Sequence, residues 1–124
     1  MAVVSITPQL RTTDLDGSIR FYTEKVGLQL EFKYGDFYAG IRAPGGGFHL
    51  KQIDAPDPSV DFVRQGEHLH LYLGVDDVDA FAQQLRAAGV ELIQSPADTA
   101  WGTRELVFND DQGHTIYTGA RHRS

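Results

Sequence analysis

The feature that most constrains this chain is an approximate internal repeat. Residues 14–28 and 77–92 follow one plan, in which an aspartate precedes a short amphipathic segment and a glycine follows it. Asp14 and Asp77 are the aspartates that precede the two segments, and Gly27 and Gly89 are the glycines that follow them. Aspartate caps helices, with Asp14 or Asp16 as the candidate in the first copy, and glycine adopts the left-handed conformation just past their ends, so each copy predicts a helix. Two copies are too few for a solenoid and indicate a paired structure with a site between its halves.

Strand-like segments surround both predicted helices. Alternating residues and turn signals predict seven strands, over 28–34, 37–43, 48–53, 68–75, 90–94, 104–109 and 115–119. A further strand is predicted over 4–12, with Pro8 inside it as the mark of an edge, a bulge or a strand that crosses to another subunit. Each half thus has the order strand, helix, strand, strand, strand. Residues 95–103 form a predicted loop that the first half does not match.

The halves meet at a stretch with two prolines, residues 54–59. Such composition is typical of a connection between structured segments. We therefore predict one domain over 1–124, with module one at about 4–53, a linker at 54–67 and module two at about 68–120.

Composition excludes several classes of protein. The chain has no cysteine, which rules out disulfides, thiolate metal sites and cysteine nucleophiles, and predicts the cytoplasm as its location. Its net charge of −6 argues against binding to nucleic acid. No apolar run approaches the roughly 20 residues that a membrane span needs, so no membrane association is expected.

A duplicated βαβββ unit with these signals resembles the vicinal-oxygen-chelate superfamily, which includes glyoxalase I, extradiol dioxygenases and bleomycin-resistance proteins. Residues 10–28, 70–78 and 101–114 carry the resemblance through their order and spacing. It implies an α+β fold of tandem βαβββ modules, whose curved mixed sheets form half-barrels around a ligand. The chain is most similar to the bleomycin-resistance branch, in which a proline like Pro8 accompanies exchange of the N-terminal strand within a homodimer.

The resemblance also implies four metal-ligand positions, and most of them lack a ligand here. They fall on Thr7, with Gln9 two residues on, on His49 or Lys51, on His70 and on Tyr117. Only His70 matches clearly, and imidazoles without a carboxylate make a poor site for Mn, Fe or Zn. We therefore expect no cofactor. The alternative is one divalent ion, Mn, Fe, Ni or Zn, held by a rearranged set of His49, His70 and Glu105.

Even without a metal ion, the space that such half-barrels enclose is a pocket for a small molecule. The predicted cavity residues are mostly aromatic or polar: Gln9, Phe37, Tyr38, His49, Lys51, His70, Tyr72, Trp101, Glu105 and Tyr117. Trp101 lies in a loop, where its ring suits stacking on a planar ligand. Asp36, Glu67 and Asp98 would add negative charge for a cationic ligand, whereas Lys51 favours an anionic or carbonyl-bearing one.

Three functions remain open at this point. The first is a metal-free homodimer that sequesters an aromatic or cationic antibiotic, as the resemblance to bleomycin-resistance proteins implies. The second is a metal-dependent lyase, isomerase or dioxygenase with a rearranged metal site. The third is a metal-free enzyme that uses His70 or Tyr117 as acid or base.

Overall fold

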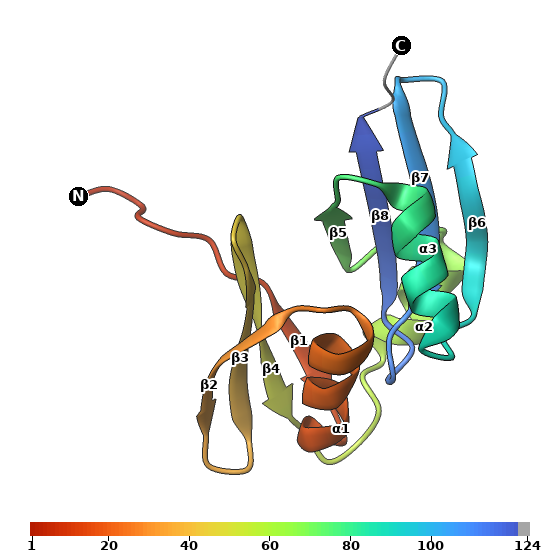
Figure 1. The fold of residues 1–124 in the computed structure, drawn as a ribbon. Helices are drawn as coiled ribbons and strands as arrows, with labels where there is room; N and C mark the ends of the chain where they lie inside the picture. Colours follow the sequence, from red (N-terminus) through yellow and green to blue (C-terminus); the bar gives the residue numbers. More distant parts are fainter. Residues whose placement is uncertain (122–124) are drawn as a thin grey trace. The chain divides into compact units, whose positions relative to one another are not determined.

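A computed structural model describes residues 1–121, which form two compact units that divide after Asp57 (Figure 1). Each unit contains a four-stranded mixed sheet with a helical segment between its first two strands. The fold class predicted from the sequence, α+β with tandem βαβββ modules, is confirmed.

Unit 1 begins with β1 (Gln9–Thr12) and continues through a helical segment into a three-stranded meander. The helical segment is α1 (Leu15–Arg20), which runs on as the π-helical turn η1 (Phe21–Lys25). The meander consists of β2 (Gln29–Tyr34), β3 (Tyr38–Ala43) and β4 (Gly46–Gln52). The strand order is β1-β4-β3-β2, with β1 parallel to β4 and the other pairs antiparallel.

Unit 2 repeats this topology after an additional helix. Its elements are α2 (Ser59–Gln65), β5 (Leu71–Gly74), α3 (Val78–Ala87), β6 (Leu92–Asp98), β7 (Thr103–Asn109) and β8 (Thr115–Arg121). The strand order is β5-β8-β7-β6, with β5 parallel to β8. No helix among the described residues is both long and apolar enough to cross a membrane.

The repeated aspartates and glycines have the predicted roles. Asp14 accepts a hydrogen bond from the backbone N–H of Gly17, and Asp77 accepts one from that of Ala80, so both cap helix N-termini. Gly27 and Gly89 follow the helical segments with φ of 89° and 83°, a conformation that favours glycine. The repeat in the sequence is therefore a repeat of helix boundaries.

In each unit the helices cover one face of the sheet and leave the other face open. Leu10, Ile41 and Leu50 are buried in unit 1, where α1 contacts β3 and β4. In unit 2, α3 contacts β6, β7 and β8, and Leu85 and Phe108 are fully buried there. Because side chains alternate along a strand, the residues between these core positions point to the open faces.

Four predicted segments differ from the structure by three residues or more. The strand predicted over 4–12 begins only at Gln9, because Pro8 cannot donate to the ladder. The strand predicted from residue 68 begins at Leu71. The second half of the predicted linker is α2, whose Val60 and Val63 are partly buried. The predicted loop over 95–103 is shorter, because β6 continues through Pro96 to Asp98 on the edge of its sheet.

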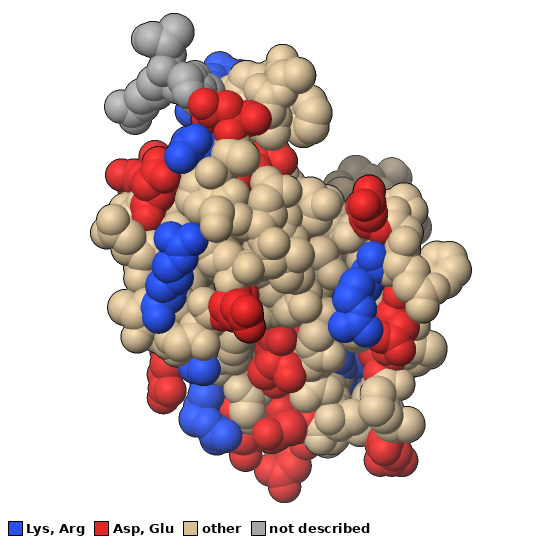
Figure 2. All heavy atoms as spheres, turned by 90° about the vertical axis from the view of Figure 1, so that its right-hand side faces the viewer, with Lys and Arg blue, Asp and Glu red and all other residues tan. Residues whose placement is uncertain are grey.

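Charges of both signs are mixed on the surface. On the face drawn in Figure 2, blue basic side chains lie singly beside red acidic ones and form no continuous field. Lys33, for example, pairs with Asp16 at 3.1 Å, and Arg104 pairs with Asp79 and Asp98.

Candidate functional site

The open face of the unit 1 sheet carries a connected group of rings. Phe32 on β2, Tyr38 on β3 and His49 on β4 meet there, and Gln9 on β1 joins them; we call these four residues the ring cluster. The rings of Phe32 and Tyr38 are stacked with centroids 6.2 Å apart, and His49 meets each of them edge-on at 5.2 Å. The cluster thus spans all four strands of the sheet.

Hydrogen bonds fix the polar edge of the ring cluster. The Tyr38 hydroxyl lies 2.9 Å from Nδ1 of His49 and accepts a hydrogen bond from Nε2 of Gln9 at 3.2 Å. Gly40 leaves room for the Phe32 ring, because a Cβ at that position would lie 2.3 Å from a ring carbon. Phe32 remains 36% exposed, so this cluster presents an aromatic surface to solvent.

A groove of about 300 Å³ lies next to this cluster within unit 1. Thr7 and His49, two of the residues that the family resemblance predicts at metal-ligand positions, both line it. Glu31 and Arg42 line it as well, beside the apolar Ile6, Ile41 and Phe48, so the groove carries both charge signs and apolar surface.

Two predicted cavity residues of unit 1 lie beside the ring cluster rather than within it. Phe37 belongs to the turn before β3, where its ring packs edge-on against Tyr34 at 5.5 Å. Lys51 is an exposed residue of β4 and is paired in register with Tyr38. Together with Arg11, its register partner on β1, it gives this face a basic margin.

The open face of unit 2 has a different chemistry, centred on a buried carboxylate. Glu105 on β7 is 7% exposed, and its Oε2 accepts hydrogen bonds from the Tyr72 hydroxyl at 2.6 Å and the Thr103 hydroxyl at 3.1 Å. Tyr72 reaches from β5 across Gly119 of β8, where a Cβ would lie 2.0 Å from the phenolic oxygen. We call Tyr72, Thr103 and Glu105 the carboxylate cluster. The pKa of Tyr72 is raised to about 12, chiefly by burial and secondly by its hydrogen bond to Glu105.

Tyr117 lies on the same open face as the carboxylate cluster. It is paired in register with Tyr72 on β5 and with Val107 on β7. A phenol therefore occupies the position at which related enzymes place a carboxylate ligand.

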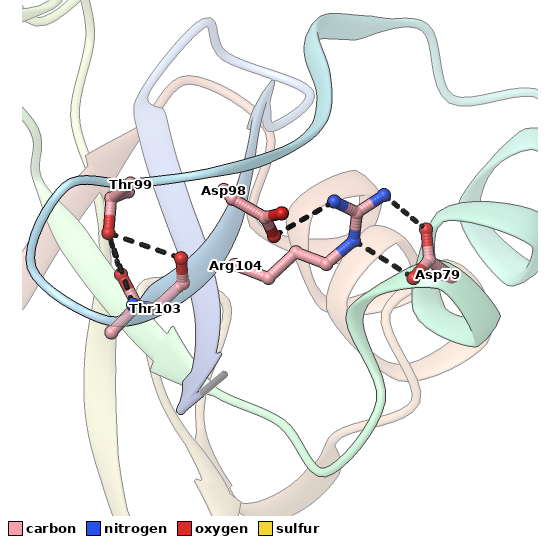
Figure 3. Close-up of polar contacts among 5 residues, drawn as sticks. All are labelled: Asp79, Asp98, Thr99, Thr103 and Arg104. Carbon is pink, nitrogen blue, oxygen red and sulfur yellow. Dashed lines mark hydrogen bonds and ion pairs between the residues drawn. The ribbon is translucent and has the colours of Figure 1, made fainter. Parts of the chain in front are cut away.

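Trp101 lies at the tip of the β6–β7 hairpin and is 73% exposed. Two groups of polar contacts stabilise this hairpin (Figure 3). Thr99 and Thr103 bond through their hydroxyls at 2.7 Å, and the Thr103 N–H donates to the Thr99 hydroxyl. Arg104 binds Asp98 and Asp79, and its hydrogen bonds to Asp79 raise the pKa of the guanidinium and lower that of the Asp79 carboxyl.

His70 takes part in a network that supports the structure of unit 2. Its Nδ1 accepts a hydrogen bond from the Thr115 backbone N–H at 3.1 Å, so the proton of the neutral ring lies on Nε2 and donates to Ser59 at 3.0 Å. Its ring meets the buried ring of His114 edge-on at 4.7 Å. Nε2 therefore does not act as a base toward Ser59 in this arrangement, although the pair resembles a nucleophile and its base.

The donor set does not fit the metal that the fold family uses. Both ring nitrogens of His70 hold hydrogen bonds, while Thr7 and Tyr117 replace stronger ligands. Of the alternative set, His49 belongs to unit 1, whereas His70 and Glu105 belong to unit 2. Within either unit, residues 1–121 contain no group of three His, Cys, Asp or Glu side chains that could hold a metal ion.

Sequence reasoning missed Phe32 and Thr103. Phe32 and Tyr34 alternate with charged residues along β2, a pattern that signals an aromatic face of the strand. Thr103 fell inside the predicted loop, and only its place at the start of β7 brings its hydroxyl to Glu105.

Comparison with known proteins identifies the class. Residues 3–117 match the model of the Glyoxalase/Bleomycin resistance protein/Dioxygenase superfamily. A probable lactoylglutathione lyase of Vibrio cholerae is 30% identical over 115 residues, which cover 86% of this chain and 83% of that protein. The chain therefore belongs to this superfamily, as the sequence predicted.

Solved structures agree with this assignment of the fold. TnmS3, an antibiotic binding protein from a Streptomyces species, is 25% identical, with a TM-score of 0.70 over 98% of this chain and 99% of that one. A bleomycin resistance determinant encoded on the transposon Tn5 is 18% identical, with a TM-score of 0.76 over 98% of this chain and all of the other.

Proposed function

We propose that this protein binds a planar aromatic small molecule without a metal ion and acts by sequestering it. The observation that carries this proposal is the ring cluster, in which Phe32, Tyr38 and His49 form one partly exposed aromatic surface. A planar ligand would stack on this surface, and the Gln9 amide and Tyr38 hydroxyl would hydrogen-bond its polar groups.

Two further points support binding rather than turnover. The residues at the family's metal positions do not form a plausible metal site, and the His70 ring nitrogens are held by backbone and serine partners. The likeness to TnmS3, whose name describes an antibiotic binding protein, favours an antibiotic as the kind of ligand.

A metal-dependent lyase is the alternative function, favoured by the 30% identity to the Vibrio protein. Such an enzyme would require ligands that this chain supplies poorly, with Thr7 and Tyr117 in place of stronger donors. Titration with Mn, Ni, Fe(II) and Zn distinguishes the two. Stoichiometric submicromolar binding that His70→Ala abolishes would support the lyase.

Calorimetric titration with an acridine that carries a neutral side chain tests the proposal. We expect saturable binding that weakens about three- to tenfold in both Phe32→Ala and Tyr38→Ala, since a stacked aromatic pair contributes about 0.5–1.5 kcal/mol. Phe62→Ala is the matched control, because Phe62 is an exposed aromatic of α2 outside the ring cluster. Equal losses in all three variants, or no binding to the wild type, would contradict the proposal.

We further propose that the protein is a homodimer, formed by exchange of the segment before β1. Val3, Val4 and Ile6 are each more than 85% exposed, and such apolar side chains favour burial against a partner. Analytical ultracentrifugation at micromolar concentration should give a dimer, and replacing these three residues by serine should give a folded monomer. A wild-type monomer would contradict this proposal.

A further inference from the structure

We propose that Glu105 is a binding site for a protonated amine, with the Tyr72 ring as its second contact. This inference goes beyond the proposed function, because the site lies within unit 2 and requires no contact with the ring cluster of unit 1. It concerns the open face of unit 2, where the carboxylate cluster takes the place of the aromatic rings of unit 1.

The first argument is the missing counter-ion. Glu105 is 93% removed from solvent, being only 7% exposed, yet no lysine, arginine or histidine among residues 1–121 forms an ion pair with it. Its neighbour in sequence, Arg104, is engaged by Asp79 and Asp98 instead. A buried carboxylate without a cation is costly, and a ligand ammonium would offset that cost.

The second argument is the orientation of the carboxylate. Both neutral donors, the hydroxyls of Tyr72 and Thr103, bind Oε2, whereas Oε1 accepts no hydrogen bond from the described residues. The Thr103 hydroxyl is itself held by Thr99. Glu105 thus has one oxygen that is fixed and one that is available to an N–H donor.

The third argument is the aromatic ring beside the carboxylate. Tyr72 is 47% exposed although its hydroxyl reaches Glu105, so part of its ring is accessible. Gly119 permits this arrangement, because a Cβ there would lie 2.0 Å from the phenolic oxygen and 3.0 Å from Cγ of Glu105. A carboxylate next to an accessible ring face is a combination that binds ammonium groups through charge and cation–π attraction.

Two matched probes test the site, 2-phenylethylammonium and the neutral 2-phenylethanol. In Glu105→Gln we expect at least a roughly tenfold loss of affinity for the ammonium probe and no change for the alcohol, because the amide keeps the shape and removes the charge. Glu91→Gln, at an exposed carboxylate of unit 2, should change neither affinity. Equal losses for both probes, or no loss for either, would overturn the assignment.

A second measurement uses the wild-type protein and does not depend on stacking. n-Butylammonium chloride should shift the amide NMR signals of Tyr72, Thr103 and Glu105 in a saturable way, whereas 1-butanol should not. If butylammonium acts so but no acridine binds, the ammonium site stands and the proposed aromatic function fails. If the neutral acridine binds the wild type while butylammonium has no effect, the proposed function stands and the ammonium site fails.

Discussion

The two units share a topology but differ in what their open faces carry. In unit 1, the ring cluster of Phe32, Tyr38 and His49 lies beside the basic Lys51. In unit 2, the carboxylate cluster has Glu105 at its centre. The repeat has kept the helix caps, the closing glycines and the strand order, which build the sheets. The residues on the open faces, to which we assign ligand binding, differ between the units.

The faces also differ in the edge from which their aromatic side chain comes. Phe32 lies on β2, at one end of its strand order, and reaches over Gly40 of β3. Tyr72 lies on β5, which is the counterpart of β1 at the other end, and reaches over Gly119 of β8. In both units a ring lies across a glycine, but the two rings come from non-equivalent strands.

The largest expected effect concerns one turn in each unit, the turn between β7 and β8 in unit 2 and the turn between β2 and β3 in unit 1. The turn after β7 is closed by Asp110, whose carboxylate accepts hydrogen bonds from the N–H groups of Gln112 and His114 and from the His114 ring. The Asp110 and His114 side chains are each 1% exposed. Asp110→Ala should lower the free energy of unfolding by about 3–5 kcal/mol, because it leaves buried N–H donors without an acceptor.

Urea unfolding measures this change, and Asp36→Ala provides the contrast in unit 1. Asp36 lies in an exposed turn and pairs with Lys33 at 3.7 Å, so its loss should cost less than about 0.5 kcal/mol. Similar losses of unfolding free energy in the two variants would mean that the buried hydrogen bonds of Asp110 have no special role in stability.

An intermediate effect is expected from the two glycines under the rings. Gly119→Ala should destabilise the protein by about 1–3 kcal/mol, since displacing Tyr72 also removes a donor from buried Glu105. Gly40→Ala displaces only the Phe32 ring, which is already 36% exposed, and should cost less than about 1 kcal/mol. Thermal unfolding of both variants gives the comparison, and an equal or reversed order would show that the hydrogen bond to Glu105 contributes little.

The sequence predicted the scaffold well because its signals are local. Asp14, Gly27, Asp77 and Gly89 mark helix ends through contacts with near neighbours, and the alternating segments mark strands. The helix over 59–65 escaped detection because it follows two prolines and lies between segments that the repeat explains.

The sites were less predictable because they depend on contacts between distant residues. Nothing near Glu105 in the sequence shows that Tyr72 will donate to it, since that bond joins two strands across a third. His70 matched a metal ligand by position, yet its ring is held by Thr115 and Ser59, which sequence reasoning had no means to place. The family resemblance thus predicted candidate positions but not their hydrogen-bond partners.

The smallest effect concerns the ionisation of Tyr72, for which the open face of unit 1 has no counterpart beside a carboxylate. Burial and the hydrogen bond to Glu105 raise the pKa of Tyr72 from 10.0 to about 12. Because the folded pKa lies above the unfolded one, the stabilisation by neutral Tyr72 is fully present below pH 10 and is lost as the pH rises toward 12. In a titration of tyrosinate absorbance, the wild type should therefore show a step near pH 12 that is lost in Tyr72→Phe. Glu105→Gln should move that step to lower pH, because a neutral amide no longer repels the phenolate. If Tyr72→Phe removes no step near pH 12, the hydroxyl is not held by the buried carboxylate, and the contrast between the two faces would then rest on Glu105 alone.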